Sequence, residues 1–142
     1  MKITECLTAE HRVFSDQLRL IERAVGNPDL YPDAVLKVMV EMFAIPLERH
    51  AQTEEEVLFP ALEAHLGRSA GPLAVMDAEH ESIRQALGAI SAGEDMRGQA
   101  SRLIEVLRGH IQKEDRVLFP MAQELLGTEG LIHLAEECAK RS

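Results

Sequence analysis

Apolar residues recur at alternating steps of three and four along four long segments, over residues 7–25, 36–61, 73–90 and 103–121. This spacing places one apolar stripe along an α-helix. Four helices of roughly 20 to 35 residues joined by short links are typical of an up-down-up-down bundle. We therefore expect an all-α fold, a four-helix bundle with a short C-terminal fifth helix over about residues 128–141.

Length and composition favour one helical domain. The 142 residues, 46% of them hydrophobic and 4% aromatic, fit a single domain over 1–142, with the bundle over about 4–127. The net charge of −9 excludes a nucleic-acid partner, because phosphate binding needs a basic surface. No segment approaches the ~20 apolar residues of a membrane span, and the N-terminus has no signal-like apolar run. With Cys6 and Cys138 as free thiols, we expect a cytoplasmic protein with no membrane partner.

One short sequence segment occurs twice in the chain. His50-Ala-Gln-Thr-Glu54-Glu-Glu-Val-Leu-Phe-Pro60 returns as His110-Ile-Gln-Lys-Glu114-Asp-Arg-Val-Leu-Phe-Pro120, with 7 of 11 positions identical. A shorter repeat precedes each copy: Thr-Ala-Glu-His11 in the first half matches Asp-Ala-Glu-His80 in the second. Each half therefore supplies one lone histidine and then a His-x-x-x-Glu pair.

These repeated residues interrupt the apolar stripes. The six polar positions on the stripes are His11, His50, Glu54, His80, His110 and Glu114. Two carboxylates facing a core would each cost several kcal/mol if unpaired, and no Lys or Arg lies on the stripes to neutralise them. A His and a Glu four residues apart share one helix face, so they can bind the same centre.

The pattern therefore predicts a site for two metal ions. Four imidazoles and two carboxylates suit iron, manganese or zinc better than calcium or magnesium. The alternative is a metal-free helical scaffold, in which the repeat records an old duplication and the polar residues form a hydrogen-bonded core.

The motifs His-x-x-x-Glu and Leu-Phe-Pro, at this spacing, resemble those of hemerythrin-like (HHE cation-binding) domains over Thr8 to Gly127. The resemblance implies a four-helix bundle that holds two Fe ions, with zinc or manganese as other occupants. It implies that the four histidines bind iron through ring nitrogens, that Glu54 and Glu114 bridge the ions, and that an oxo or hydroxo group completes the bridge.

The chain departs from the oxygen carriers of that family. Those have a second histidine one turn after the one on the third helix, where this chain has Arg84, and a His-x-x-x-x-Asp on the fourth helix, where this chain has His110-x-x-x-Glu114. The pattern is closer to that of relatives linked to iron sensing, nitric-oxide response and repair of iron centres. If each iron has roughly six positions, one position per ion stays open.

Nearby polar residues are interpreted as bystanders. We expect these acidic residues to be solvated charges rather than spare ligands: Glu10, Glu55, Glu79, Glu81 and Asp115. His65 and His133 are interpreted as surface or packing histidines. Since residues before proline avoid the α region, each ligand helix is expected to break or bend near Pro60 or Pro120.

Two classes of function follow. The first is a binding protein that binds or senses O2, NO or peroxide at the di-iron centre, with a signalling protein as a possible reader. The second is enzyme-like: detoxification of peroxide or NO, or donation of iron to a protein whose iron centre is repaired. We expect no cysteine-containing N-terminal domain of the kind that repair relatives carry, since His11 already belongs to the bundle, and Glu-x-x-His pairs of ferritin-like oxidases are absent from the sequence. We therefore favour a metal- and ligand-binding protein over a dedicated enzyme.

Overall fold

The computed structural model describes residues 1–141, and the all-α prediction is confirmed, because these residues contain helices and connecting turns but no strand. The elements are α1 (Ile3–Val25), α2 (Asp33–Thr53), η1 (Glu54–Leu58), α3 (Phe59–Leu66), α4 (Pro72–Ser91), α5 (Met96–Lys113), η2 (Glu114–Leu118) and α6 (Phe119–Lys140). The elements η1 and η2 are single π-helical turns. Among these residues, no helix has both the length and the apolar character that crossing a bilayer requires.

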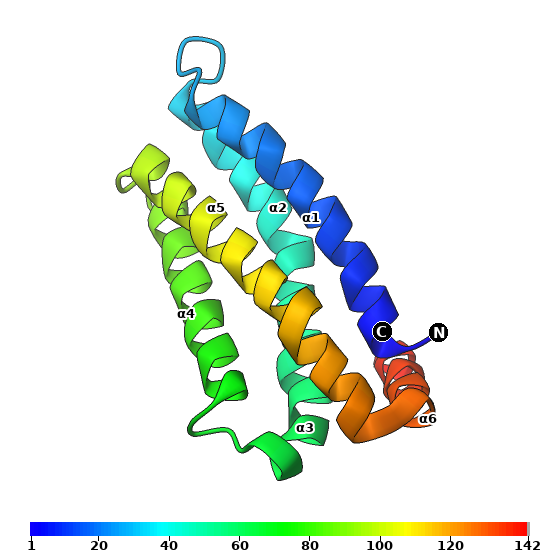
Figure 1. Ribbon diagram of the computed structural model, residues 1–142. Helices are drawn as coiled ribbons and strands as arrows, with labels where there is room; N and C mark the ends of the chain where they lie inside the picture. Colours follow the sequence, from blue (N-terminus) through cyan, green and yellow to red (C-terminus); the bar gives the residue numbers. More distant parts are fainter. Residues whose placement is uncertain (142) are drawn as a thin grey trace.

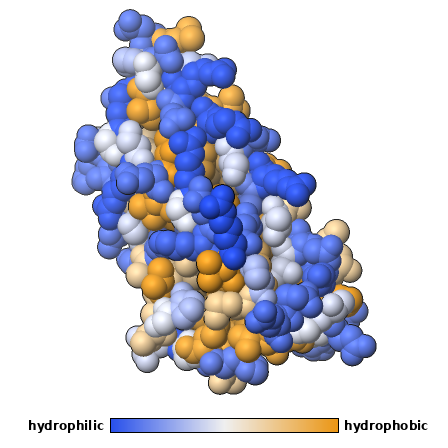
Figure 2. Space-filling model, viewed as in Figure 1, coloured by the Kyte–Doolittle hydropathy of each residue, from blue (hydrophilic) through white to orange (hydrophobic). Residues whose placement is uncertain are grey.

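The four long helices α1, α2, α4 and α5 lie side by side and alternate in direction along the chain (Figure 1). Around this group, α1 contacts α2 and α5, and α4 contacts the same two helices. The end of α6 lies beside the start of α1, so both chain termini lie at one end of the molecule (Figure 1). Hydrophilic side chains cover most of the face in Figure 2, with apolar side chains gathered toward the end that carries α3 and α6.

The interior contains two apolar clusters along the length of the helices. One cluster includes Phe14, Leu18 and Leu103, and the other includes Leu7 and Leu58. On α1, the buried His11 lies between Leu7 of one cluster and Phe14 of the other. The polar positions of the stripes therefore lie in a layer that is closed by apolar side chains on both sides.

The expectation was that each ligand helix breaks or bends at its Leu-Phe-Pro segment. Neither helix breaks, because the backbone stays helical through both segments, but each α-helix changes there to a π-helical turn. Each proline is the second residue of the next helix, directly after a π-helical turn. In each such turn, the amide of Phe59 or Phe119 donates to a carbonyl five residues back, at Glu54 or Glu114. A proline ring clashes with the carbonyl four residues before it in a regular α-helix, and the wider turn relieves this clash.

The glycine after each repeat ends the regular helix. Gly67 has φ 72° and ψ 171°, and Gly127 has nearly the same values, φ 71° and ψ 169°. Side chains other than hydrogen are strained in this region. After Gly67 the chain enters a loop, whereas after Gly127 it resumes a helical path within α6.

Candidate metal centre

Six buried polar side chains from both halves of the chain converge between the apolar clusters. Each is at most 5% exposed, and both glutamates are fully buried. They are His11 of α1, His50 of α2, His80 of α4, His110 of α5, and Glu54 and Glu114, which begin the two π-helical turns. The structure therefore brings together every residue that the sequence places on a polar stripe position.

The histidines form two pairs. The Nε2 atoms of His11 and His50 lie 3.2 Å apart, and those of His80 and His110 also lie 3.2 Å apart. Two groups of donor atoms close enough to hold an ion contain these pairs: His11, His50, Glu54 and Glu114 in one, and Glu54, His80 and His110 in the other. The halves of the chain thus create two adjacent positions for a cation.

Glu114 extends between the two histidine pairs. Its Oε1 atom lies 3.1 Å from Nε2 of His11 and 3.3 Å from Nε2 of His110. The first histidine belongs to the other half of the sequence, whereas the second lies one turn earlier on the same helix. One carboxylate therefore reaches both positions.

Glu54 has the equivalent place in the other half. Its Oε1 atom lies 2.9 Å from Nε2 of His80, and its Oε2 atom lies 3.2 Å from Nε2 of His50. The two oxygens thus face opposite histidine pairs.

The Nδ1 atom of each of the four buried histidines contacts one further acidic side chain, and we call these four acids the outer carboxylates. The Nδ1 contacts are His11 with Asp115 (2.8 Å), His50 with Glu10 (2.7 Å), His80 with Glu55 (2.7 Å) and His110 with Glu79 (2.9 Å). Such a contact fixes the ring and leaves Nε2 free to face a metal.

Glu10, Glu81 and Asp115 are exposed, in line with the expectation of solvated charges, whereas Glu55 and Glu79 are half-buried. The expectation missed that every one of these acids except Glu81 contacts a histidine of the cluster. The sequence does contain a signal for these acids, because each outer carboxylate directly precedes or follows one of the six donor residues. Sequence alone did not show which histidine each acid contacts.

The charge of the centre fits a cation. The Oε2 atoms of Glu54 and Glu114 are buried, and neither makes a contact with hydrogen-bond geometry among the described residues, although Oε2 of Glu54 lies 3.2 Å from Nε2 of His50. Burial opposes a positive charge on His50 and His110, but the adjacent carboxylates outweigh it and raise the pKa of both rings well above its ordinary value. Burial also opposes charge on Glu54, yet its contact with Glu114 and the His50 charge hold the pKa of Glu54 well below its usual range. The interior thus favours an ionised Glu54 carboxylate together with positive charge on the neighbouring rings.

Aromatic rings cover the histidines. Phe119 stacks on His11 with ring centres 5.5 Å apart, and Phe59 stacks on His80 at 5.8 Å. Phe14 meets His50 edge-on at 5.1 Å. These contacts hold the rings in place and exclude water from the histidine layer.

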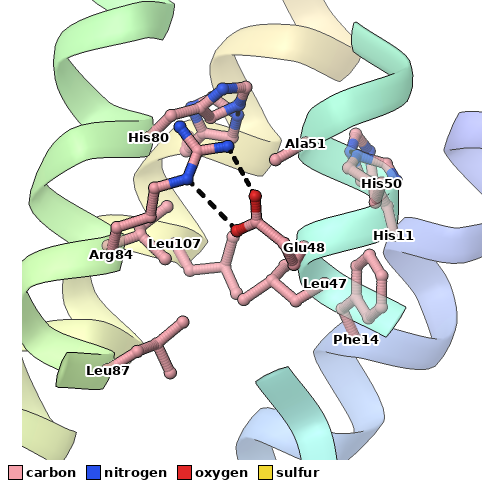
Figure 3. Close-up of a pocket in the computed structure, with 12 residues that line it drawn as sticks. His11, Phe14, Leu47, Glu48, His50, Ala51, His80, Arg84, Leu87 and Leu107 are labelled. Carbon is pink, nitrogen blue, oxygen red and sulfur yellow. Dashed lines mark hydrogen bonds and ion pairs between the residues drawn. The ribbon is translucent and has the colours of Figure 1, made fainter. Parts of the chain in front are cut away.

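A small pocket beside the histidines is mostly apolar (Figure 3). All four histidines line it, together with leucines such as Leu47, Leu87 and Leu107. At its edge, the Arg84 guanidinium donates to both carboxylate oxygens of Glu48, at 2.9 and 3.1 Å (Figure 3). A small molecule in this pocket would lie beside the four buried histidines.

The two remaining histidines lie elsewhere. His65 on α3 is exposed, and His133 on α6 is exposed and pairs with Glu137 at 3.0 Å. Neither belongs to a group of residues that could hold a metal among those the structure describes.

Comparison with known proteins agrees with this centre. The family model described as the hemerythrin HHE cation-binding domain matches residues 2–122. Proteins named iron-sulfur cluster repair protein YtfE, from Escherichia coli O139:H28 and Shigella boydii serotype 18, are 29% identical over 121 residues. The match covers 75% of this chain and 54% of each relative, so the chain spans about half the length of these relatives. No solved structure matches the chain. With the model matching most of its length and the histidine–glutamate cluster in place, the chain belongs to the hemerythrin HHE cation-binding family.

Proposed function

We propose that this protein binds a di-iron centre. One iron ion is held by His11 and His50 and the other by His80 and His110, with Glu54 and Glu114 bridging. The observation that carries the proposal is the pair of buried carboxylates, each of which faces both histidine pairs and keeps one oxygen without a partner. A dinuclear cation site satisfies all of these atoms, whereas a hydrogen-bonded core leaves two of them unpaired.

Iron is favoured over zinc and manganese by the relatives. Imidazole and carboxylate donors accept all three metals. The printed name of the similar proteins concerns iron-sulfur clusters, and the family is a cation-binding one. Metal analysis of protein purified from its source separates the three.

The ligand of the centre is proposed to be O2, NO or peroxide. Bound iron supplies a redox-active centre with one open position per ion for such a molecule. The chain contributes the apolar pocket at the inward nitrogens, the aromatic rings that exclude water, and the outer carboxylates that orient the histidines. A pocket of this kind suits a small, weakly polar ligand better than a charged metabolite.

A second candidate function is donation of iron in the repair of iron centres. It is favoured by the name of the similar proteins, which the chain matches over about half of their length. In that case the partner is a protein that accepts iron, whereas a sensor would act through a signalling protein. In both cases we propose that residues 1–142 act as one domain in the cytoplasm.

The first test is metal content after anaerobic loading with ferrous iron and removal of excess. We expect two iron ions per chain, and a value below one refutes the centre. Glu54→Ala or Glu114→Ala removes a bridge and should release at least one ion. His65→Ala is the matched control, because His65 is exposed and remote from the donor groups. Loss of iron from this control contradicts the assignment.

The second test separates binding from catalysis. An anaerobic optical spectrum of the iron-loaded protein is recorded and then followed after addition of air, NO or peroxide. A stable spectral change that reverses on removal of the ligand supports binding or sensing. Repeated consumption of peroxide or NO supports enzyme-like detoxification, and transfer of iron to an iron-depleted acceptor protein supports donation.

A further inference from the structure

The outer carboxylates of the two metal positions differ in their charge partners. On the side of His80 and His110, both carboxylates are bound by cations. Arg84 donates to Glu55 through two nitrogens, at 2.8 and 2.9 Å, and Lys113 pairs with Glu79. Glu55 and Glu79 are only 22% and 17% exposed, so water screens these ion pairs weakly.

On the side of His11 and His50, neither outer carboxylate is bound by a cation. Within residues 1–141, Asp115 and Glu10 contact their histidines and form no ion pair with Lys or Arg. Arg12 and Arg19 line the same surface hollow as Asp115, but Arg19 pairs with Asp16, and Arg12 forms no ion pair with either outer carboxylate among the described residues. Water screens Glu10, which is 52% exposed, more than Asp115, at 35%, so Asp115 contributes most of the negative charge.

The difference is located at two positions of the repeat. Arg84 stands four residues after His80, and the matching position after His11 is Ser15. Lys113 stands three residues after His110, and the matching position after His50 is Thr53. The ligands and outer carboxylates are duplicated, but the two cations are present in one half of the site only.

From this we infer, on the basis of the proposed di-iron function, that Arg84 and Lys113 give the two metal positions unequal affinities for iron. Both are positioning residues, because they act through the outer carboxylates that they bind. The position of His11 and His50 binds its ion more tightly, and the position of His80 and His110 releases its ion first. A free carboxylate on Nδ1 makes imidazole a stronger donor, whereas a cation on that carboxylate withdraws this effect.

The same difference in charge partners sets the order in which the two iron ions are reduced and oxidised. Net charge and hydrogen bonds around a metal set its reduction potential. The negative environment of His11 and His50 stabilises the ferric ion, so the ion at His80 and His110 is reduced first and oxidised last. In the proposed function, the exchangeable and more easily reduced ion is therefore the one next to Arg84.

The test is the distribution of a limiting amount of iron. Apo protein receives one ferrous ion per chain without oxygen, and anomalous diffraction from crystals gives the occupancy of each position. We expect the His11 and His50 position to hold about 10 to 100 times more iron, the range that changes in outer partners produce. Equal occupancy, or the reverse order, overturns the inference.

Exchange of residues between the halves identifies the cause. The double variant Arg84→Ser with Lys113→Thr installs the residues of the other half, and it should bring the two occupancies within about threefold. Arg84→Lys keeps the charge and should keep the preference. Arg108→Ser is the matched control, since it removes a bidentate ion pair with Glu22 that contacts no ligand histidine. An unchanged preference in the double variant, or a lost one in the control, overturns the inference.

A reductive titration of the fully loaded protein provides an independent readout. The separation of the two one-electron potentials should shrink in the double variant, by about 59 mV for each tenfold change in the ratio of ferric to ferrous affinity between the two positions. Circular dichroism of each apo variant checks that the helices are intact. Two ions bound without any preference overturn this inference and leave the proposed function standing, whereas no bound ion overturns both.

Discussion

Iron loading should raise the melting temperature of this protein by a large amount. Without an ion, Glu54 and Glu114 are fully buried, and each keeps one oxygen without a hydrogen-bond partner. A buried acceptor left unpaired costs about 1–3 kcal/mol, so the pair costs about 2–6 kcal/mol. Free iron at a hundredfold excess over its dissociation constant contributes about 2.7 kcal/mol per site, which agrees with this range for two sites.

The assay is differential scanning calorimetry of apo and iron-loaded protein, without oxygen. For a domain of 142 residues, 1 kcal/mol corresponds to roughly 4 °C, so loading should raise the melting temperature by about 8–24 °C. Addition of a chelator should reverse the shift. Glu54→Gln removes a bridging charge with little change in shape, and we expect it to reduce the rise in melting temperature on iron loading by at least half. His65→Ala should leave the increment unchanged.

Two results would refute this reasoning. If apo and loaded protein melt within about 2 °C of one another, the buried carboxylates are satisfied without a metal. If Glu54→Gln keeps the full increment, the ion is bound elsewhere in the protein.

Four further predictions concern the core, the outer carboxylates and two glycines. Leu18→Ala removes a fully buried side chain and should destabilise the protein by about 2.7–5 kcal/mol in urea unfolding, with iron content retained. Asp115→Asn weakens the contact with Nδ1 of His11 and should lower iron affinity about 10- to 100-fold in competition with a chelator. Gly88→Ala, where an added Cβ meets nothing within 4 Å, should stabilise by about 0.5–1 kcal/mol. Gly127→Ala, at φ 71°, should destabilise by about 1–3 kcal/mol, measured as a shift of the urea midpoint.

The helical segments and the donor residues were predictable because they depend on local periodicity. His50 and Glu54 are four residues apart, so any α-helical path puts them on one face, and the apolar residues around them fix that face toward the core. The same argument holds for His110 and Glu114. The hydrophobic pattern along each helix was therefore sufficient to predict which side chains are buried.

The π-helical turns and the outer carboxylates were not predictable in this way. Directly after each π-helical turn, Phe59 or Phe119 stacks on a histidine from another helix. Glu10 is adjacent to His11 in sequence but contacts His50 of α2. Helical periodicity contains no information about such contacts, because they depend on how neighbouring helices are placed.

By itself, the sequence determined an all-helical chain, a duplicated set of six donors and their burial, since each of these follows from spacing along one helix. Only the tertiary structure decided that Glu114 meets His11 and that Glu54 meets His80, which joins the two halves into one centre. It also decided that Arg84 and Lys113 neutralise the carboxylates of one position alone. The physical reason is that these contacts connect different helices, and their geometry is set by side-chain packing across the interior rather than by the order of residues along any helix.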